Sequence, residues 1–156
     1  MSADKRLQEL GFVLPPAPPA VGVYKPALTI GSLCYTSGHL PVMTDESLLV
    51  GCVGKDVDQQ AGYDAARQAG LTMLATLQSY LGSLDQVQRV VKLFGMVNCT
   101  AEFTQQPAVI NGCSELMAQV FGDDEGVGTR SAVGVAALPM GVIVEIEGVF
   151  ELKVQG

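Results

Sequence analysis

Residues 142–153 constrain the possible folds more than any other stretch of this sequence. Their side chains alternate in character with a period of two, which is the pattern of a β-strand with two different faces. One face is apolar and must pack against helices, whereas the other mixes polar groups with Ile143 and Val149. We therefore expect a sheet that helices cover on one side and that offers its other face to further subunits. The apolar face consists of Val142, Val144, Ile146, Gly148, Phe150 and Leu152.

Two helices that can cover such a face are indicated by apolar residues at spacings of three and four. Asp56 or Asp58 can cap the longer helix, which runs to about Leu81. The shorter helix begins near Pro107, a residue that suits the first helical turn, and stops at Gly122.

The strands and helices follow one another in the order β-β-β-α-β-α-β-β. The first two strands form a hairpin around Gly31-Ser32, and the last two are expected to form a hairpin that turns near Pro139-Met140. The fold class is therefore α+β, a single mixed sheet of about six strands with two helices on one face. The chain is one domain, residues 1–156, in which residues 1–20 form a short helix and a proline-rich extension. The other expected strands cover residues 27–30, 33–36, 48–53 and 89–99.

The charge of the chain limits its partners. The net charge is −7, with 9 basic and 16 acidic residues, and Lys and Arg form no cluster, which argues against nucleic acid and membrane surfaces. Only 16% of the residues are charged, where about 25% is usual, which indicates surface hidden in an oligomer. No apolar run approaches the roughly 20 residues of a membrane span, and the polar start lacks the apolar core of a secretory signal. We expect a cytoplasmic protein.

Metal binding is not expected from the cysteines and the histidine. The four cysteines form no Cys-x-x-Cys pair, and His39 is the single histidine. The cysteines are interpreted as buried free thiols, because free Cys packs as a small apolar residue.

Three charged residues of the last two strands are candidates for chemistry. Arg130 is either a surface residue, paired with Asp123 or Asp124, or a guanidinium whose planar fork grips a carboxylate. Glu145 and Glu147 either form a solvated face or provide a carboxylate that orients or deprotonates a water molecule.

Arg130 and Glu145 do not face each other in the expected hairpin. If the turn centres near Pro139-Met140, Arg130 lies opposite residues 149–150. The offset from Glu145 is then four to five residues, or roughly 15 Å at the usual rise per residue. A bulge or a neighbouring subunit is needed to bring the two side chains together.

Ser37-Gly38 ends a predicted strand, where backbone amides can face a ligand. No Gly-x-Ser-x-Gly elbow accompanies it, so a nucleophilic serine is not indicated. His39 is interpreted as an ordinary loop residue.

Four segments resemble the YjgF-like, or reactive-intermediate deaminase (Rid), family, and the resemblance covers nearly the whole chain from Gly22 on. The last segment is the most specific, because its Arg, Leu-Pro and Glu-x-Glu recur at the family's spacing. The leader Leu14-Pro-Pro is similar to a longer-chain subgroup that is often labelled endoribonuclease L-PSP. The segments are Gly22-Val-Tyr24-Lys25, Tyr35-Thr-Ser37-Gly38-His39-Leu-Pro41, Val109-Ile-Asn111, and Thr129-Arg130-Ser131 with Leu138-Pro139 and Val144-Glu145-Ile-Glu147.

The resemblance implies a chorismate-mutase-like fold that assembles as a homotrimer, with sites in clefts between subunits. It also implies hydrolysis of short-lived enamines and imines, such as 2-aminoacrylate, to a 2-keto acid and ammonia, with no cofactor. By resemblance, Arg130 binds the substrate carboxylate, and Glu145 orients the water and transfers protons. The other site residues that the resemblance implies are Tyr24, Ser37, Gly38 and Asn111.

Three departures from the family's pattern border this cleft and bear on substrate range. Gly128-Thr129 stands where the family usually has Pro-Ala, Ala132 where Cys is common, and His39 where the motif has Gln.

Two other functions stay open. A non-catalytic protein that binds a 2-keto acid or a similar small carboxylate would keep Arg130 but would not need Glu145. An RNA-cleaving enzyme is suggested by the label endoribonuclease, but the net charge of −7 and the single histidine count against it.

Overall fold

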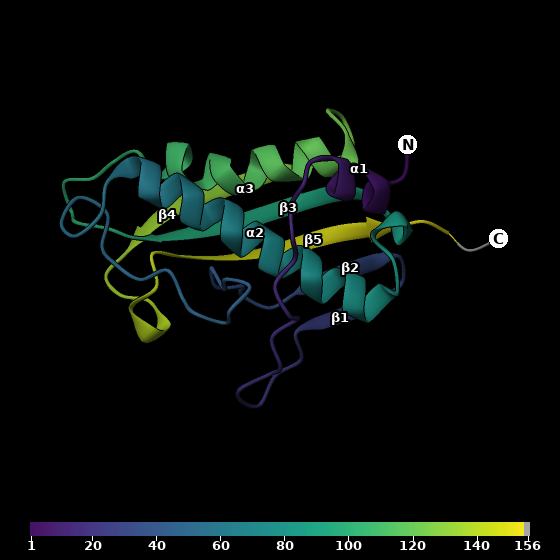
Figure 1. Cartoon of the computed structure of the whole chain (residues 1–156), viewed down its shortest axis with the longest axis horizontal. Helices are drawn as coiled ribbons and strands as arrows, with labels where there is room; N and C mark the ends of the chain where they lie inside the picture. Colours follow the sequence, from purple (N-terminus) through teal and green to yellow (C-terminus); the bar gives the residue numbers. More distant parts are fainter. Residues whose placement is uncertain (155–156) are drawn as a thin grey trace.

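A computed structural model describes residues 1–154 and contains one mixed sheet with helices on one face (Figure 1). The strands lie in the order β1-β2-β5-β3-β4, and all neighbours are antiparallel except β3 and β4. The predicted α+β class is confirmed, with five strands rather than about six. The elements are α1 (Ala3–Glu9), β1 (Ala27–Ile30), β2 (Leu33–Thr36), α2 (Gln59–Leu81), β3 (Val87–Asn98), α3 (Gln106–Phe121), β4 (Thr129–Val135) and β5 (Val144–Leu152).

The predicted limits of the two long helices are confirmed. Asp58 is the N-cap of α2, and its carboxylate accepts a hydrogen bond from the Ala61 amide at 2.8 Å. The helix ends at Gly82, whose φ of 85° is a left-handed conformation that favours glycine. Pro107 lies in the first turn of α3, and Gly122 follows its last residue.

The expected strand over residues 48–53 does not form. The residues of this stretch make only isolated bridges: Leu48 to Val42, Val50 to Val142, and Val53 to Val57 and Cys99. The physical reason is the path of the backbone, because Gly51 and Gly54 have φ values of 141° and 90° and bend the chain away from a continuous ladder.

The predicted hairpin between the last two strands is wrong, because β3 lies between β4 and β5 (Figure 1). The β3–α3–β4 segment is a parallel crossover, which places β4 at the edge of the sheet. β5 then pairs antiparallel with the other side of β3. A short 3₁₀ turn, Pro139–Gly141, lies in the connection, and Met140 in this turn has a φ of 55°. The first hairpin has the predicted register, with Ile30 opposite Leu33.

The core lies between the sheet and the two long helices. Val144, Ile146 and Phe150 are fully buried, as the two-faced pattern of residues 142–153 predicts. The helices themselves approach closely, since a Cβ atom on Gly112 would lie 2.0 Å from the backbone oxygen of Tyr63. Cys34 and Cys113 are buried in this core, whereas the other two free cysteines are half-buried.

The outer face of the sheet is the one that the helices do not cover, and apolar side chains remain exposed on it. Leu28 and Tyr35 are paired residues of β1 and β2, and their exposed fractions are 44% and 42%. Val133 on β4 is exposed to a similar degree. This face fits the sequence expectation of a surface that further subunits cover.

The segment from 10 to 26, called the arm below, has no regular structure and runs from α1 across α2 to β1 (Figure 1). None of the helices within residues 1–154 is long and apolar enough to cross a membrane.

Candidate active site

The predicted site residues fall into two separate pockets of the chain. Tyr24, Ser37, Gly38 and Glu145 line a cavity of about 560 Å³, which we call the acid pocket. Asn111 and Arg130 line a smaller cavity of about 290 Å³, which we call the arginine pocket.

The acid pocket is built where the chain leaves β2 and continues beside β5. The His39 amide donates to the Ile146 carbonyl at 2.7 Å, and the Ile146 amide donates back at 3.0 Å. This pair of bonds holds Gly38 next to Glu145. A Cβ atom on Gly38 would lie only 2.4 Å from a carboxylate oxygen of Glu145, so the carboxylate occupies the space that any larger residue would fill.

Ser37 ties the arm to this corner. Its hydroxyl donates to the Lys25 carbonyl at 2.6 Å, and its amide donates to the Pro26 carbonyl at 2.9 Å. The Ser37 amide is therefore not free to face a ligand, contrary to the expectation from the sequence. Tyr24 lies at the rim, where its hydroxyl accepts a hydrogen bond from the Val21 amide at 3.2 Å.

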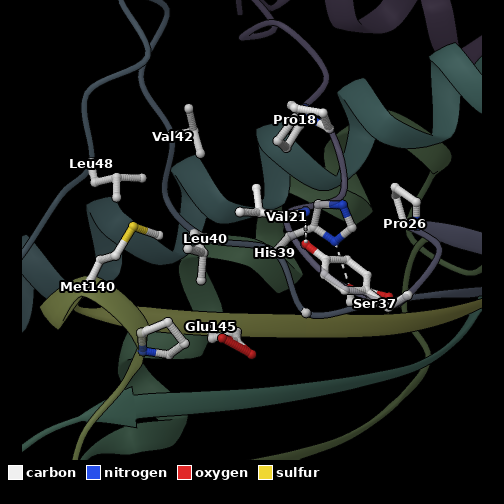
Figure 2. Close-up of a pocket in the computed structure, with 14 residues that line it drawn as sticks. Pro18, Val21, Pro26, Ser37, His39, Leu40, Val42, Leu48, Met140 and Glu145 are labelled. Carbon is white, nitrogen blue, oxygen red and sulfur yellow. Dashed lines mark hydrogen bonds between the residues drawn. The ribbon is translucent and has the colours of Figure 1, made fainter.

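His39 has a larger structural role than the sequence indicated. The buried imidazole lies with Nδ1 2.8 Å from the Ser37 carbonyl (Figure 2). Its Nε2 lies 2.8 Å from the Thr76 hydroxyl. A carbonyl only accepts, so Nδ1 carries the hydrogen. Burial lowers the pKa of His39 to about 4, against the opposing effect of the Ser37 carbonyl. The ring is thus neutral at pH 7, and Nε2 accepts from Thr76.

Glu145 is the acid of the acid pocket. Burial, followed by the nearby Glu147 carboxylate, raises the pKa of Glu145 above its ordinary value. Among the described residues, those that line this pocket include no Lys or Arg. The pocket can therefore orient or deprotonate a water molecule, but by itself it offers no cation for a substrate carboxylate.

The arginine pocket holds the guanidinium of Arg130, which has no counter-ion within residues 1–154. One nitrogen of Arg130 donates to Asn111 Oδ1 at 2.7 Å and to Ser114 Oγ at 3.1 Å, both on α3. The suggested pairing with Asp123 or Asp124 is wrong, because Asp124 pairs with Arg89 at 3.1 Å and Arg130 forms no salt bridge within residues 1–154. The guanidinium is oriented from one side and keeps other N–H donors for a carboxylate.

The side chains of Arg130 and Glu145 point to opposite faces of the sheet. Arg130 is paired with Leu93, which is paired with Gly148 on β5, while Glu145 is paired with Met96. Glu145 is three residues from Gly148, an odd step, so its side chain points away from the helix-covered face where Arg130 meets α3. Glu145 lies two strands away from Arg130 and three residues further along the strand direction. At the usual spacings in a sheet, their Cα atoms are therefore roughly 14 Å apart. The large distance that the sequence predicted between Arg130 and Glu145 is therefore present, although the hairpin from which it was calculated does not form.

The apolar wall of the acid pocket was not foreseen. It contains no chemically distinctive residue, and the only sequence signal was the nearness of the proline-rich stretch to Tyr24. Within residues 1–154, no three His, Cys, Asp or Glu side chains gather to hold a metal ion. The unforeseen lining residues are Pro18, Pro19, Val21, Pro26, Leu40, Val42, Leu48, Pro139 and Met140.

Comparison with known proteins matches nearly the whole chain to the family that the sequence motifs resemble. The family model described as "YjgF/chorismate_mutase-like, putative endoribonuclease" matches residues 4–149. Protein TCP17 of Trypanosoma cruzi is 40% identical over 147 residues, which cover 94% of this chain and 92% of that protein. The "Putative reactive intermediate deaminase TdcF" of Escherichia coli K12 is 30% identical over 134 residues, which cover 85% and 89%.

A solved structure shares the fold closely. The crystal structure of a "putative endoribonuclease" from Shewanella oneidensis MR-1 superposes with a TM-score of 0.93 at 29% identity, covering 97% of this chain and all of that one. The family match, the curated relatives and the solved structure confirm the resemblance that the four sequence segments indicated. The chain therefore belongs to the YjgF/chorismate-mutase-like family.

Proposed function

We propose that this protein hydrolyses enamines and imines that carry a carboxylate, such as 2-aminoacrylate, to a 2-keto acid and ammonia. The observation that carries the proposal is the division of the site into two incomplete halves. The acid pocket has Glu145 but no cation among its described lining residues, and Arg130 has no counter-ion within residues 1–154. One substrate with a carboxylate at one end and an imine at the other satisfies both halves.

Assembly as a homotrimer brings the halves together. The outer sheet face exposes Leu28 and Tyr35 and carries Glu145, whereas Arg130 lies at the β4 edge on the other face. Contact between two different surfaces of identical chains forms a closed ring when the rotation between neighbours closes, and a rotation of a third of a turn gives a ring of three copies. Each cleft then combines Glu145 of one subunit with Arg130 of the next. The name of TdcF, a reactive intermediate deaminase, supports the same class of substrate.

The reaction needs positioning more than a strong nucleophile, because an imine next to a carboxylate is already electrophilic. An enamine first takes a proton from solvent at its terminal carbon and becomes the iminium ion. Water then forms a bond to the iminium carbon, the π electrons of the carbon–nitrogen double bond move onto nitrogen, and Glu145 accepts one proton of the water. Glu145 passes this proton to the nitrogen, and the carbon–nitrogen bond breaks as the hydroxyl proton returns to solvent, which leaves the keto group and releases ammonia.

The environments of the two charged groups suit these roles. Burial raises the pKa of Glu145, which makes its carboxylate a better base. Asn111 and Ser114 already orient the Arg130 side chain, so that it loses little conformational freedom when the substrate binds. Tyr24 at the rim closes the cleft over the substrate.

The test generates 2-aminoacrylate with a serine dehydratase and follows pyruvate release with and without the protein. Arg130→Ala should lower kcat/KM about a hundredfold or more, since two charge-assisted hydrogen bonds to the carboxylate are lost. Arg67→Ala is the matched control, because that guanidinium lies on α2 against Asp64 and over the Phe12 and Tyr63 rings. Full activity in Arg130→Ala, with wild-type activity in the control, would remove Arg130 from the reaction.

A non-catalytic carboxylate-binding protein is the second candidate, and the unpaired guanidinium of Arg130 within the described chain favours it equally. Glu145→Gln separates the two functions, because it removes the base and keeps Arg130. Titration calorimetry should show that pyruvate binds to both the wild-type protein and Glu145→Gln. Binding without any turnover in the wild-type protein would establish the second function.

A further inference from the structure

The acid pocket extends beyond the polar groups that the proposed reaction uses. Figure 2 shows Leu48 and Met140 at one end of the pocket and Ser37 at the other, with Glu145 between them. Nine of the fourteen lining residues are apolar, so most of the wall offers no side-chain hydrogen bond to a ligand. The nine are Pro18, Pro19, Val21, Pro26, Leu40, Val42, Leu48, Pro139 and Met140.

The arm forms one side of this apolar wall and is held in place at its end. Ser37 binds the carbonyls of Lys25 and Pro26 through its hydroxyl and its amide. The Tyr24 hydroxyl accepts from the Val21 amide, which closes a turn at the tip. Because proline rings also restrict the backbone, the wall is present before a ligand binds.

The cavity is larger than the smallest imines require. Its volume of about 560 Å³ lies in the range of roughly 300–1,000 Å³ that is typical of sites for larger ligands. The carboxylate and imine groups of 2-aminoacrylate would meet Arg130 and Glu145, but its single methylene group would leave Leu48 and Met140 in contact with water. A substrate with a large apolar side chain would cover them.

We propose that the arm, the loop from 40 to 48 and the turn at Pro139-Met140 form a side-chain pocket that selects imino acids with branched or aromatic side chains over 2-aminoacrylate. This inference rests on the proposed function. Imines of that kind arise when the corresponding amino acids are oxidised at the α-carbon. The protein would therefore act after an amino-acid-oxidising enzyme rather than after a dehydratase of hydroxy amino acids.

The experiment compares three substrates of the same protein. An L-amino-acid oxidase with catalase generates the imines of leucine and phenylalanine, and a serine dehydratase generates 2-aminoacrylate. The apparent kcat/KM for 2-keto acid release above the uncatalysed rate is measured for each. We expect the leucine and phenylalanine imines to exceed 2-aminoacrylate by about tenfold or more, since a single methylene in an apolar pocket is worth roughly that factor.

Two substitutions on the same arm locate the effect. Val21→Ser places a hydroxyl on the wall and should lower the preference for the leucine imine about tenfold. Val23→Ser is the matched control, because Val23 is fully exposed and does not line the pocket. The control should keep the wild-type preference.

The outcomes separate this inference from the proposed function. If 2-aminoacrylate is hydrolysed as well as the leucine and phenylalanine imines, the side-chain pocket is wrong and the proposed function stands. If no imine is hydrolysed faster than in buffer, both are wrong. If Val21→Ser changes the oligomeric state and leaves the preference unaltered, Val21 contacts a neighbouring copy of the chain rather than the substrate.

Discussion

The acid pocket and the arginine pocket are built in opposite ways. The arginine pocket is a single guanidinium oriented by two polar groups of α3, in a cavity half the size of the other. The acid pocket is a large apolar cavity in which one carboxylate lies against the backbone of Gly38. The first is suited to hold a charge, and the second is suited to hold an apolar group beside a base.

Under the proposed function, neither pocket is a complete site by itself. A carboxylate binds weakly without a cation, and a guanidinium alone has no group that can activate water. The sheet keeps the halves apart within one chain, because Arg130 and Glu145 point to opposite faces of it. The comparison therefore predicts that activity depends on two chains at once.

Mixing two inactive variants tests this dependence most directly. Arg130→Ala and Glu145→Gln are each expected to be inactive, and trimers assembled from equal amounts of both should regain about a quarter of the wild-type activity. A cleft is intact only when one subunit supplies Glu145 and the next supplies Arg130, which has a chance of one half for each. Activity is measured after native mass spectrometry has shown mixed oligomers. Mixed oligomers without activity would place both residues in the same chain's site.

Adding a methyl group at Gly38 tests how closely the Glu145 carboxylate packs against the Gly38 backbone. Gly38→Ala would place Cβ 2.4 Å from a carboxylate oxygen of Glu145, and the flexible carboxylate must move. We expect kcat/KM to fall about a hundredfold, because a displacement of about 1 Å in a catalytic group has an effect of that size. The melting temperature should change little, since no backbone atom is displaced.

Gly128→Ala is the counterpart beside the arginine pocket. Its Cβ would lie 2.6 Å from the backbone oxygen of Val90, which cannot move without shifting β3. This variant should lose stability, by about 1–3 kcal/mol, and melting curves measure the loss. We expect a larger loss in Gly128→Ala, where the new methyl group meets backbone, than in Gly38→Ala, where it meets a flexible side chain. Equal losses of stability in the two variants would contradict this expectation.

His39, which lines the acid pocket, should make the stability of the protein depend on pH. His39 has a pKa of about 4 in the folded protein against an ordinary value of 6.5. Between these values the unfolded chain binds a proton that the folded chain does not, so stability is complete above pH 6.5 and is lost as pH falls toward 4. From pH 7.5 to pH 5.0, His39 alone should contribute a loss of about 2 kcal/mol, from 1.5 pH units at 1.36 kcal/mol each.

His39→Gln isolates this effect, because the glutamine amide can donate and accept but does not titrate. Urea unfolding at the two pH values should show a smaller loss in the variant than in the wild-type protein. The same loss in both proteins would show that the buried imidazole is not its source.

Local patterns were sufficient to predict the elements whose signals lie within a few residues. The ends of α2 at Asp58 and Gly82 were predicted from residue types that commonly cap helices. The two-residue turn at Gly31-Ser32 fixed which residues of the first hairpin face each other. The outer and inner sides of β5 followed from its period of two. Strand pairing did not follow, because neighbours in the sequence need not be neighbours in the sheet.

The sequence by itself determined the helices, the two-faced last strand, the family and the residue types of the site, since each depends on local spacing or on a matching motif. Only the tertiary structure decided that β3 separates β4 from β5 and that Arg130 and Glu145 lie on opposite faces. It also decided that the arm covers the acid pocket and that His39 is buried against Thr76. These outcomes depend on contacts between residues far apart in the chain, and such contacts are selected by the packing of the whole core rather than by any short pattern.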